Sequence, residues 1–306
     1  NTLSARAELA RNFTVTQLYN DELTTEGVDP FYERLFTFNR NYNLRWSIFK
    51  SLTLDYTARA NAVIDEPDGV IEGDINTTSE RDYIMDRILS LGRMKNYQQD
   101  ISANYRLPLD KLPLTDWLSA DYRISVGYNW IAGSLNQEDS LGNFFGHTIQ
   151  NKRDQTYTGK VDLVGLYNKI GFLKDVNTPQ RRGGRSRNQS EPDESPTMGP
   201  GIKTILRLLM SLRSINFSYT VRESTGLPGF TPEPYMFGMD TNWMSPGWSF
   251  ILGDQNPDFR FRAAENGWLT ESPLLSTPFQ QTFDTDLSIR ANVEPFPDLK
   301  IQLEAN

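Results

Sequence analysis

The chain has 306 residues with 31 basic and 39 acidic side chains, which gives a formal net charge of −8. Nucleic acid is therefore not expected as a partner, because binding to phosphates requires clustered Lys and Arg. The absence of cysteine excludes disulfide scaffolds, thiolate zinc sites and cysteine nucleophiles. No apolar run reaches the ~18 residues that a membrane-spanning helix needs. The chain begins at Asn1 without a signal peptide, so we expect the natural N-terminus to lie outside it.

Alternation of apolar and polar residues is the main structural signal, and it predicts long β-strands. After a weaker run over Leu3–Val15, residues Phe36–Ile48 carry mainly apolar side chains at even positions and polar ones at odd positions. Leu52–Ala62 repeats the pattern, and Lys50-Ser51 between the two runs predicts a tight hairpin. Because successive strand residues point to opposite faces, each run predicts one apolar face and one polar face.

The same pattern predicts six further strands. They are Tyr97–Leu107, Leu118–Trp130, Tyr157–Tyr167, Ile215–Val221, Phe283–Val293 and Leu299–Ala305. Turns are expected at Pro108–Asp116 and Pro295–Pro297. Single-chain bacterial barrels normally have an even number of strands and no open edge in the membrane, so further strands are expected from sequence beyond this chain.

Longer segments separate the predicted hairpins. Residues 65–92 predict a loop with a short helix from about Ser79, with Ile84, Ile88 and Leu91 on one face. The remaining segments are a polar loop from Gly133 to Asp154, a mobile polar loop over 178–200, a short buried helix or buried strand over Ile202–Leu212, and an insertion over 226–279 that is rich in Pro, Gly and aromatic residues. We expect this insertion to fold into the barrel or over it.

Strand length and aromatic spacing favour a membrane barrel over a soluble β-sandwich, which would alternate in the same way. Soluble strands usually have about 5–6 residues, whereas membrane-spanning strands need about 9–11. The runs in this sequence are of the second kind. Trp117 precedes one strand, and Tyr128 and Trp130 end it. At about 3.3 Å per residue, the distance from Trp117 to Trp130 is roughly 43 Å along the strand. At a tilt of about 40° it is roughly 33 Å along the membrane normal, which suits two aromatic girdles on either side of an apolar band.

The alternation also assigns side chains to the two sides of the barrel wall. The predicted lumen-facing residues are Arg45, Asp55, Arg59, Asp121, Arg123, Asp284, Asp286 and Arg290. The predicted outward-facing residues are Tyr42, Leu44, Trp46, Tyr122, Ile124, Val126, Tyr128 and Trp130.

Two arginines and a row of alanines do not suit a lipid-facing surface. Arg11 and Arg40 fall on the apolar row, where an arginine at mid-membrane costs about 2–4 kcal/mol. They are therefore expected near an interface or under a protein cover. Ala58, Ala60 and Ala62 are small for a lipid surface and suggest another protein surface packed against them.

Few residues suggest catalysis or metal binding. The single histidine, His147, lies in the predicted polar loop, and no G-x-S-x-G motif accompanies it. Asp254, Asn256 and Asp258 have the spacing that begins a calcium loop, but Phe259 stands where glycine is required, so a turn or capping role is preferred. We therefore predict no enzyme activity, no catalytic residue, no cofactor and no metal site.

Two charged groups also have simpler explanations. Asp284 and Asp286 could form an acid pair on one strand face, although a solvated lumen surface is the preferred explanation. Residues 181–187 contain four arginines that are followed at once by Glu191, Asp193 and Glu194, and this segment fits a mobile loop. The four are Arg181, Arg182, Arg185 and Arg187.

Several longer motifs resemble one family of bacterial proteins. The motifs are Asn61–Pro67, Leu166–Lys169 with Phe172–Lys174, Leu206–Arg213 with Leu227–Phe230, and Gly247–Gly253. Over essentially the whole chain, they resemble the SprA/Sov family, the outer-membrane translocon of the type IX secretion system that is also linked to gliding motility. The resemblance implies that residues 1–306 are a section of a very large antiparallel transmembrane β-barrel.

The resemblance further implies a protein-conducting channel that carries folded cargo proteins across the bacterial outer membrane. Its implied partners are the secreted cargo, a PorV-type outer-membrane barrel, a periplasmic plug protein and the lipid bilayer. The family suggests no catalytic residues. Two alternatives remain open: an uptake barrel of the TonB-dependent type, and a soluble β-rich adhesin or binding domain.

Overall fold

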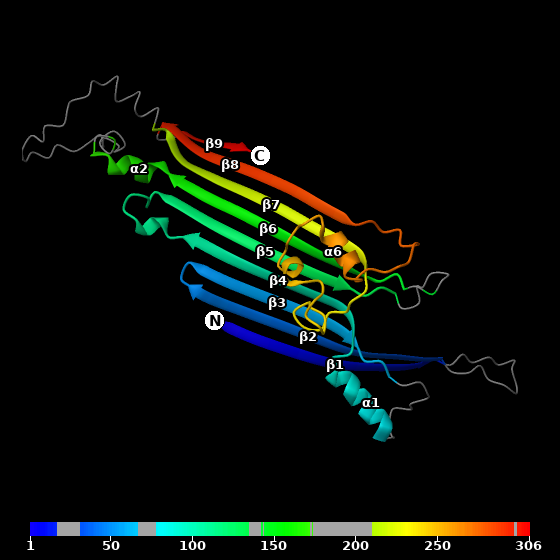
Figure 1. The fold of residues 1–306 in the computed structure, drawn as a ribbon. Coiled ribbons are helices and arrows are strands. Elements are labelled where there is room, and N and C mark those ends of the chain that lie inside the picture. The colour runs from blue at the N-terminus through cyan, green and yellow to red at the C-terminus, as the bar shows by residue number, and fades with distance from the viewer. Residues whose placement is uncertain are drawn as a thin grey trace, which may run out of the picture.

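Nine strands form the body of the part of the chain that the structure describes (Figure 1). The computed structural model describes residues 1–16, 31–66, 78–134, 142, 144–171, 173, 210–296 and 299–306. The strands are β1 (Thr2–Thr16), β2 (Phe31–Phe49), β3 (Leu52–Val63), β4 (Arg93–Leu107), β5 (Leu118–Ile131), β6 (His147–Asp162), β7 (Leu212–Phe230), β8 (Gln280–Phe296) and β9 (Leu299–Ala305).

The strands form one antiparallel meander in which each strand pairs with the next along the chain. The all-β prediction is confirmed, and every predicted run overlaps a strand. Within the described residues the sheet is open, with β1 and β9 at its edges, and it does not close on itself. None of the helices in the described residues is long and apolar enough to cross a membrane.

Short helices occupy the connections between strands. Helix α1 (Thr78–Leu89) lies between β3 and β4, and its Ile84 is buried in a small apolar cluster with Phe38 and Ile64. Helix α2 (Leu163–Lys169) follows β6, and the Asp162 carboxylate caps it by accepting from two backbone N–H groups. The other helices in the part of the chain that the structure describes are the 3₁₀ turn η1 (Leu109–Lys111), α5 (Trp248–Ile251) and α6 (Phe259–Glu265).

Two predicted loop boundaries are wrong. The predicted polar loop Gly133–Asp154 ends at residue 146, because His147–Asp154 is the first half of β6. Residues 226–230 belong to β7, so the insertion that follows comprises residues 231–279 and is called the insertion below. The predicted mobile loop over 178–200 lies outside the described residues, as do residues 202–209 of the predicted buried segment.

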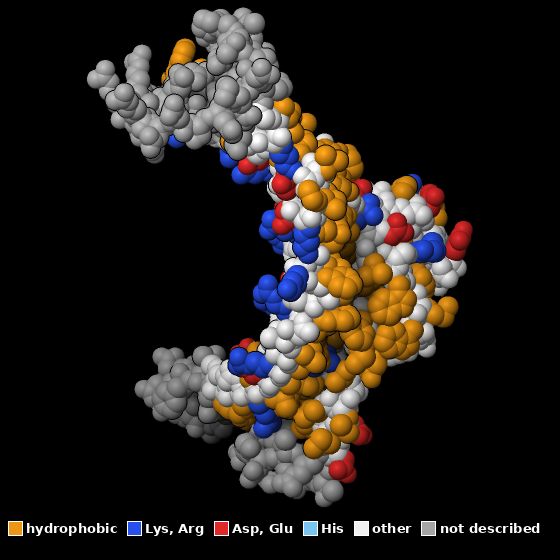
Figure 2. All heavy atoms as spheres, turned by 90° about the vertical axis from the view of Figure 1, so that its left-hand side faces the viewer, with side chains coloured by type: hydrophobic (Ala, Val, Ile, Leu, Met, Phe, Trp, Pro, Cys, Tyr) orange, Lys and Arg blue, Asp and Glu red, His pale blue; other side chains and the backbone are white. Residues whose placement is uncertain are grey.

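The sheet is curved and its two faces differ in composition. Figure 2 shows Lys and Arg side chains along the concave side and hydrophobic side chains over the convex side. The insertion packs on the convex face, where its Met239 and Phe250 join Tyr128 and Trp130 in the main apolar core. The core of this protein therefore lies between one end of the sheet and the insertion.

Candidate functional site

The concave face carries polar side chains on every rung of the sheet. One rung runs through Arg45, Asp55, Ser102, Ser125, Asp154, Arg222 and Asp284 from β2 to β8. Because antiparallel partners share a face, this register places the polar rows of successive strands side by side. The result is a continuous hydrophilic surface across the meander.

Charges on this face are paired across strands. Arg45 on β2 lies 3.4 Å from Asp55 on β3, and Arg290 on β8 lies 2.8 Å from Glu304 on β9. Such exposed pairs contribute only about 0–1 kcal/mol each to stability. Their main effect is therefore on the surface itself, which presents alternating charge to water without a large net potential of one sign.

Gly127 lets one ion pair cross a whole strand. Lys152 on β6 reaches over Gly127 of β5 to a carboxylate oxygen of Asp100 on β4, 3.3 Å away. A Cβ atom at Gly127 would collide with the Lys152 side chain and come within 2.9 Å of Asp100. The missing side chain also opens a polar hollow of about 500 Å³, whose rim includes Arg222 and Asp284.

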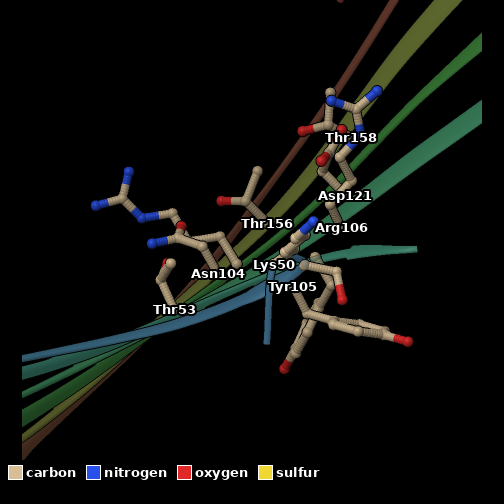
Figure 3. Close-up of a pocket in the computed structure, with 11 residues that line it drawn as sticks. Lys50, Thr53, Asn104, Tyr105, Arg106, Asp121, Thr156 and Thr158 are labelled. Atoms are coloured by element: carbon tan, nitrogen blue, oxygen red, sulfur yellow. The ribbon is translucent and has the colours of Figure 1, made fainter. Parts of the chain in front are cut away.

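A second polar hollow lies nearer the hairpin turns, with a volume of about 250 Å³. Figure 3 shows Thr53, Asp121 and Thr156 on one side of the sheet there, and Tyr105 on the other. Threonine, asparagine and charged side chains are among the residues that line this hollow. Its lining contains no buried titratable group and no nucleophile next to a base. These hollows open on a polar surface and lack the convergent groups of a catalytic site.

The convex face has an exposed apolar region close to the hairpin turns. Its main feature is a row of tyrosines that crosses four neighbouring strands, formed by Tyr105, Tyr122, Tyr157 and Tyr219. The Tyr122 and Tyr157 rings are 4.8 Å apart, and Tyr157 is 6.3 Å from Tyr219. Leu287 continues this tyrosine row onto β8 and is 51% exposed.

The insertion covers the other end of the convex face. Tyr128 and Trp130 are 1% and 0% exposed, and the Trp130 indole donates a hydrogen bond to the Pro232 carbonyl at 3.0 Å. A Cβ atom on Gly238 of the insertion would lie 2.7 Å from Tyr128, so the backbone itself packs on the aromatic ring. The predicted outer girdle at Tyr128 and Trp130 is therefore wrong in one respect: both rings are buried in protein.

Polar side chains on the convex face gather beneath this cover. Asn151 of β6 donates to the carbonyls of Phe250 and Asp254 at 2.8 and 2.9 Å. Gln255 of the insertion donates to the Asn151 side-chain oxygen and accepts from the Thr225 hydroxyl. At the rim, Arg153 and Glu223 form an ion pair of 2.6 Å. A buried amide is costly without partners, so this network fixes where the insertion sits.

Of the two arginines on the apolar row, Arg40 is buried, whereas Arg11 stays exposed and is held by an ion pair. Arg40 is 4% exposed, with its guanidinium over the Phe38 ring at 5.1 Å. Arg11 forms a bidentate pair with Glu66, with distances of 2.5 and 3.1 Å. Ala58, Ala60 and Ala62 are each 2% exposed, because the insertion and the α1 cluster pack on them.

Arg93 pairs in the same way with Asp65 at the end of β3. The guanidinium binds both carboxylate oxygens, at 2.8 and 2.6 Å, and these hydrogen bonds hold the pKa of Asp65 below its ordinary value. The pair ties the start of the β3–β4 connection to β4.

All sixteen residues assigned to a face by alternation lie on strands, and the register separates them into two sets. The eight predicted lumen-facing residues share the concave face. The eight predicted outward-facing residues share the convex face, where Val126, Tyr128 and Trp130 are covered by the insertion. Asp284 and Asp286 both bind the Arg222 guanidinium. Alternation did not identify Asn151, Arg153 and Glu223 as functional residues. The sequence feature that could have identified them is a polar side chain at an apolar position of the alternation.

His147 is the first residue of β6 and is not a loop residue as predicted. It is 6% exposed, its ring lies 4.4 Å from Trp130, and its Nδ1 accepts from the Gly133 backbone N–H at 3.0 Å.

Asn256 accepts from the Asp258 backbone N–H, as a turn residue would. The described residues contain no group of three or more His, Asp or Glu side chains that could hold a metal ion. The arginine cluster over 181–187 lies outside them.

Comparison with known proteins adds no relative. No protein-family model matches the chain, and no curated protein sequence matches it significantly.

Proposed function

We propose that this chain is a section of the wall of an outer-membrane protein-conducting channel, with the concave face toward the pore. The observation that carries the proposal is the contrast between the two faces of one sheet. Its concave face is polar on every rung, while its convex face exposes Trp46 at 47%, Tyr157 at 41% and Phe283 at 69%. In a soluble protein such an apolar face would be covered by a second layer.

Strand length supports a membrane-spanning wall. The first eight strands have 12 to 19 residues, more than the about 9–11 that a tilted spanning strand needs. An open edge within hydrocarbon would leave unpaired backbone groups. The proposal therefore includes further strands that pair with β1 and β9 and close the wall.

The choice of cargo rests on the resemblance to the SprA/Sov translocons. The concave face suits a conduit for folded proteins, because small hydroxyl and amide side chains with mutually paired charges offer few adhesive apolar patches to a passing surface. We propose secretion and gliding motility as the processes served, and a PorV-type barrel and a periplasmic plug as partners.

Neighbouring residues on β8 provide the test. Asp286 and Leu287 lie on opposite faces and are both exposed, and the chain has no cysteine of its own. In intact outer membranes, Asp286→Cys should react with a charged maleimide, whereas Leu287→Cys should react only with a lipid-soluble one. Equal reaction of both with the charged reagent would overturn the membrane assignment.

A crosslinking experiment tests conduction separately. A photoreactive side chain at Arg123, on the concave face, should capture secreted proteins in transit, whereas one at Leu287 should not. Capture of small solutes without any captured protein would favour an uptake barrel instead.

A further inference from the structure

The insertion carries an exposed apolar surface of its own. This insertion patch consists of Tyr235, Met236, Phe237, Trp243, Met244, Trp248 and Leu252. Their exposed fractions run from 43% at Phe237 to 64% at Met244, and the Trp243 and Trp248 rings stack 6.1 Å apart. So many exposed aromatic and methionine side chains on one short segment mark a surface that contacts something apolar.

The tyrosine row defines the depth of the sheet in a membrane. Tyrosine side chains gather at membrane–water interfaces, because an apolar ring ends in a polar hydroxyl. Beyond this row the chain enters the β4–β5 turn, which carries Asp110, Lys111 and Asp116. Charged turns of this kind belong in water, so the hydrocarbon extends from the tyrosine row in the other direction, toward Val126 and Trp130.

Distances along β5 then place the insertion at membrane depth. The edge of the insertion that faces the tyrosine row meets the rung of Tyr56 and Val126. There the Phe237 ring lies 6.2 Å from the Tyr56 ring, and Gly253 packs on Val126. From Tyr122 to Val126 is four residues, or roughly 13 Å along the strand and roughly 10 Å along the membrane normal. An apolar band of about 25 Å cannot fit in that strip.

We propose, on the basis of the proposed membrane wall, that the insertion patch contacts lipid and replaces the sheet as the outer surface of the wall at this level. The bilayer then contacts the uncovered sheet near the tyrosine row, and it contacts the insertion at the rungs from Val126 to Trp130. The polarity of the insertion agrees with this depth. Its charged helix α6 lies toward the end of β7 opposite α2 (Figure 1), next to the contact between Trp268 and Phe230 at the end of that strand.

This arrangement explains why polar groups occur on the lipid side of the sheet. Asn151 and Arg40 lie at membrane depth by the same arithmetic, yet both are buried in protein, with Asn151 directly beneath the insertion. The apolar side chains of the patch take over the contact with lipid that Tyr128 and Trp130 would otherwise make.

Spin labels at three positions test the proposal in the intact protein, reconstituted in phospholipid bilayers. Met244→Cys reports on the insertion patch, Leu287→Cys on the bare sheet and Ser125→Cys on the concave face. Collision with oxygen, which concentrates in hydrocarbon, is compared with collision with a water-soluble nickel complex. We expect oxygen to dominate at Met244 and Leu287, and nickel to dominate at Ser125.

The possible outcomes separate this inference from the proposed function. Nickel dominance at Met244 with oxygen dominance at Leu287 would overturn the inference and leave the membrane wall intact. Nickel dominance at both would overturn the membrane wall, and the inference with it. A Met244 label shielded from both reagents would show that a protein partner, and not lipid, covers the patch, and would also overturn the inference.

Discussion

Asn151 offers the sharpest test of how the insertion is held on the sheet. The side chain is 0% exposed, donates to the Phe250 and Asp254 carbonyls at 2.8 and 2.9 Å, and accepts from Gln255 at 3.0 Å. Asn151→Leu keeps the number and branching of the side-chain heavy atoms but removes all three hydrogen bonds. At about 1 kcal/mol net for each bond, the insertion should lose about 3 kcal/mol of its local stability against release from the sheet.

Hydrogen–deuterium exchange measures this loss directly. Since every 1.4 kcal/mol corresponds to a factor of ten, protected amides in residues 231–279 should exchange roughly 100-fold faster in Asn151→Leu. The matched control is Asn129→Leu, on the concave face of β5, which should leave the insertion unchanged. Unchanged exchange in the insertion would refute the reasoning, as would an equal increase throughout β5–β7, because the network is argued to hold the insertion and not the sheet.

Three further predictions concern the same end of the sheet. Trp130→Ala should destabilise the insertion by about 3–5 kcal/mol in a thermal unfolding measurement, because a fully buried ring is lost. The control Trp46→Ala, at a site that is 47% exposed, should cost clearly less stability in the same measurement. Ala60→Leu should cost about 1–3 kcal/mol by overpacking under the insertion, and an unchanged melting temperature would contradict the close packing. The lowered pKa of Asp65 means that its pair with Arg93 stabilises the fold above about pH 4, the ordinary aspartate value, and that this contribution is lost as the pH falls through the folded pKa. Asp65→Asn should remove that acid-dependent part of the exchange protection near the end of β3.

The sequence by itself determined the strands and the division of their side chains between two faces. From Phe36 onward in β2, and along β5, apolar and polar residues alternate almost without interruption, and side-chain direction in a strand depends only on the local backbone. The residues assigned to one face, such as Asp121 and Arg123, therefore share that face in the sheet. The small residues at Ala58 and Ala60 also signalled a protein cover, which the insertion provides.

Only the tertiary structure decided what lies against each face. The first half of β6 was assigned to a loop because Asn151 and Arg153 make both of its rows polar, and they are polar because they face the insertion and its rim. Trp130 reads as a lipid-facing girdle residue from its position in the strand, yet it is buried beneath Pro232, more than 100 residues later in the chain. A period of two records the direction of a side chain, whereas its environment depends on contacts between segments that are distant in sequence.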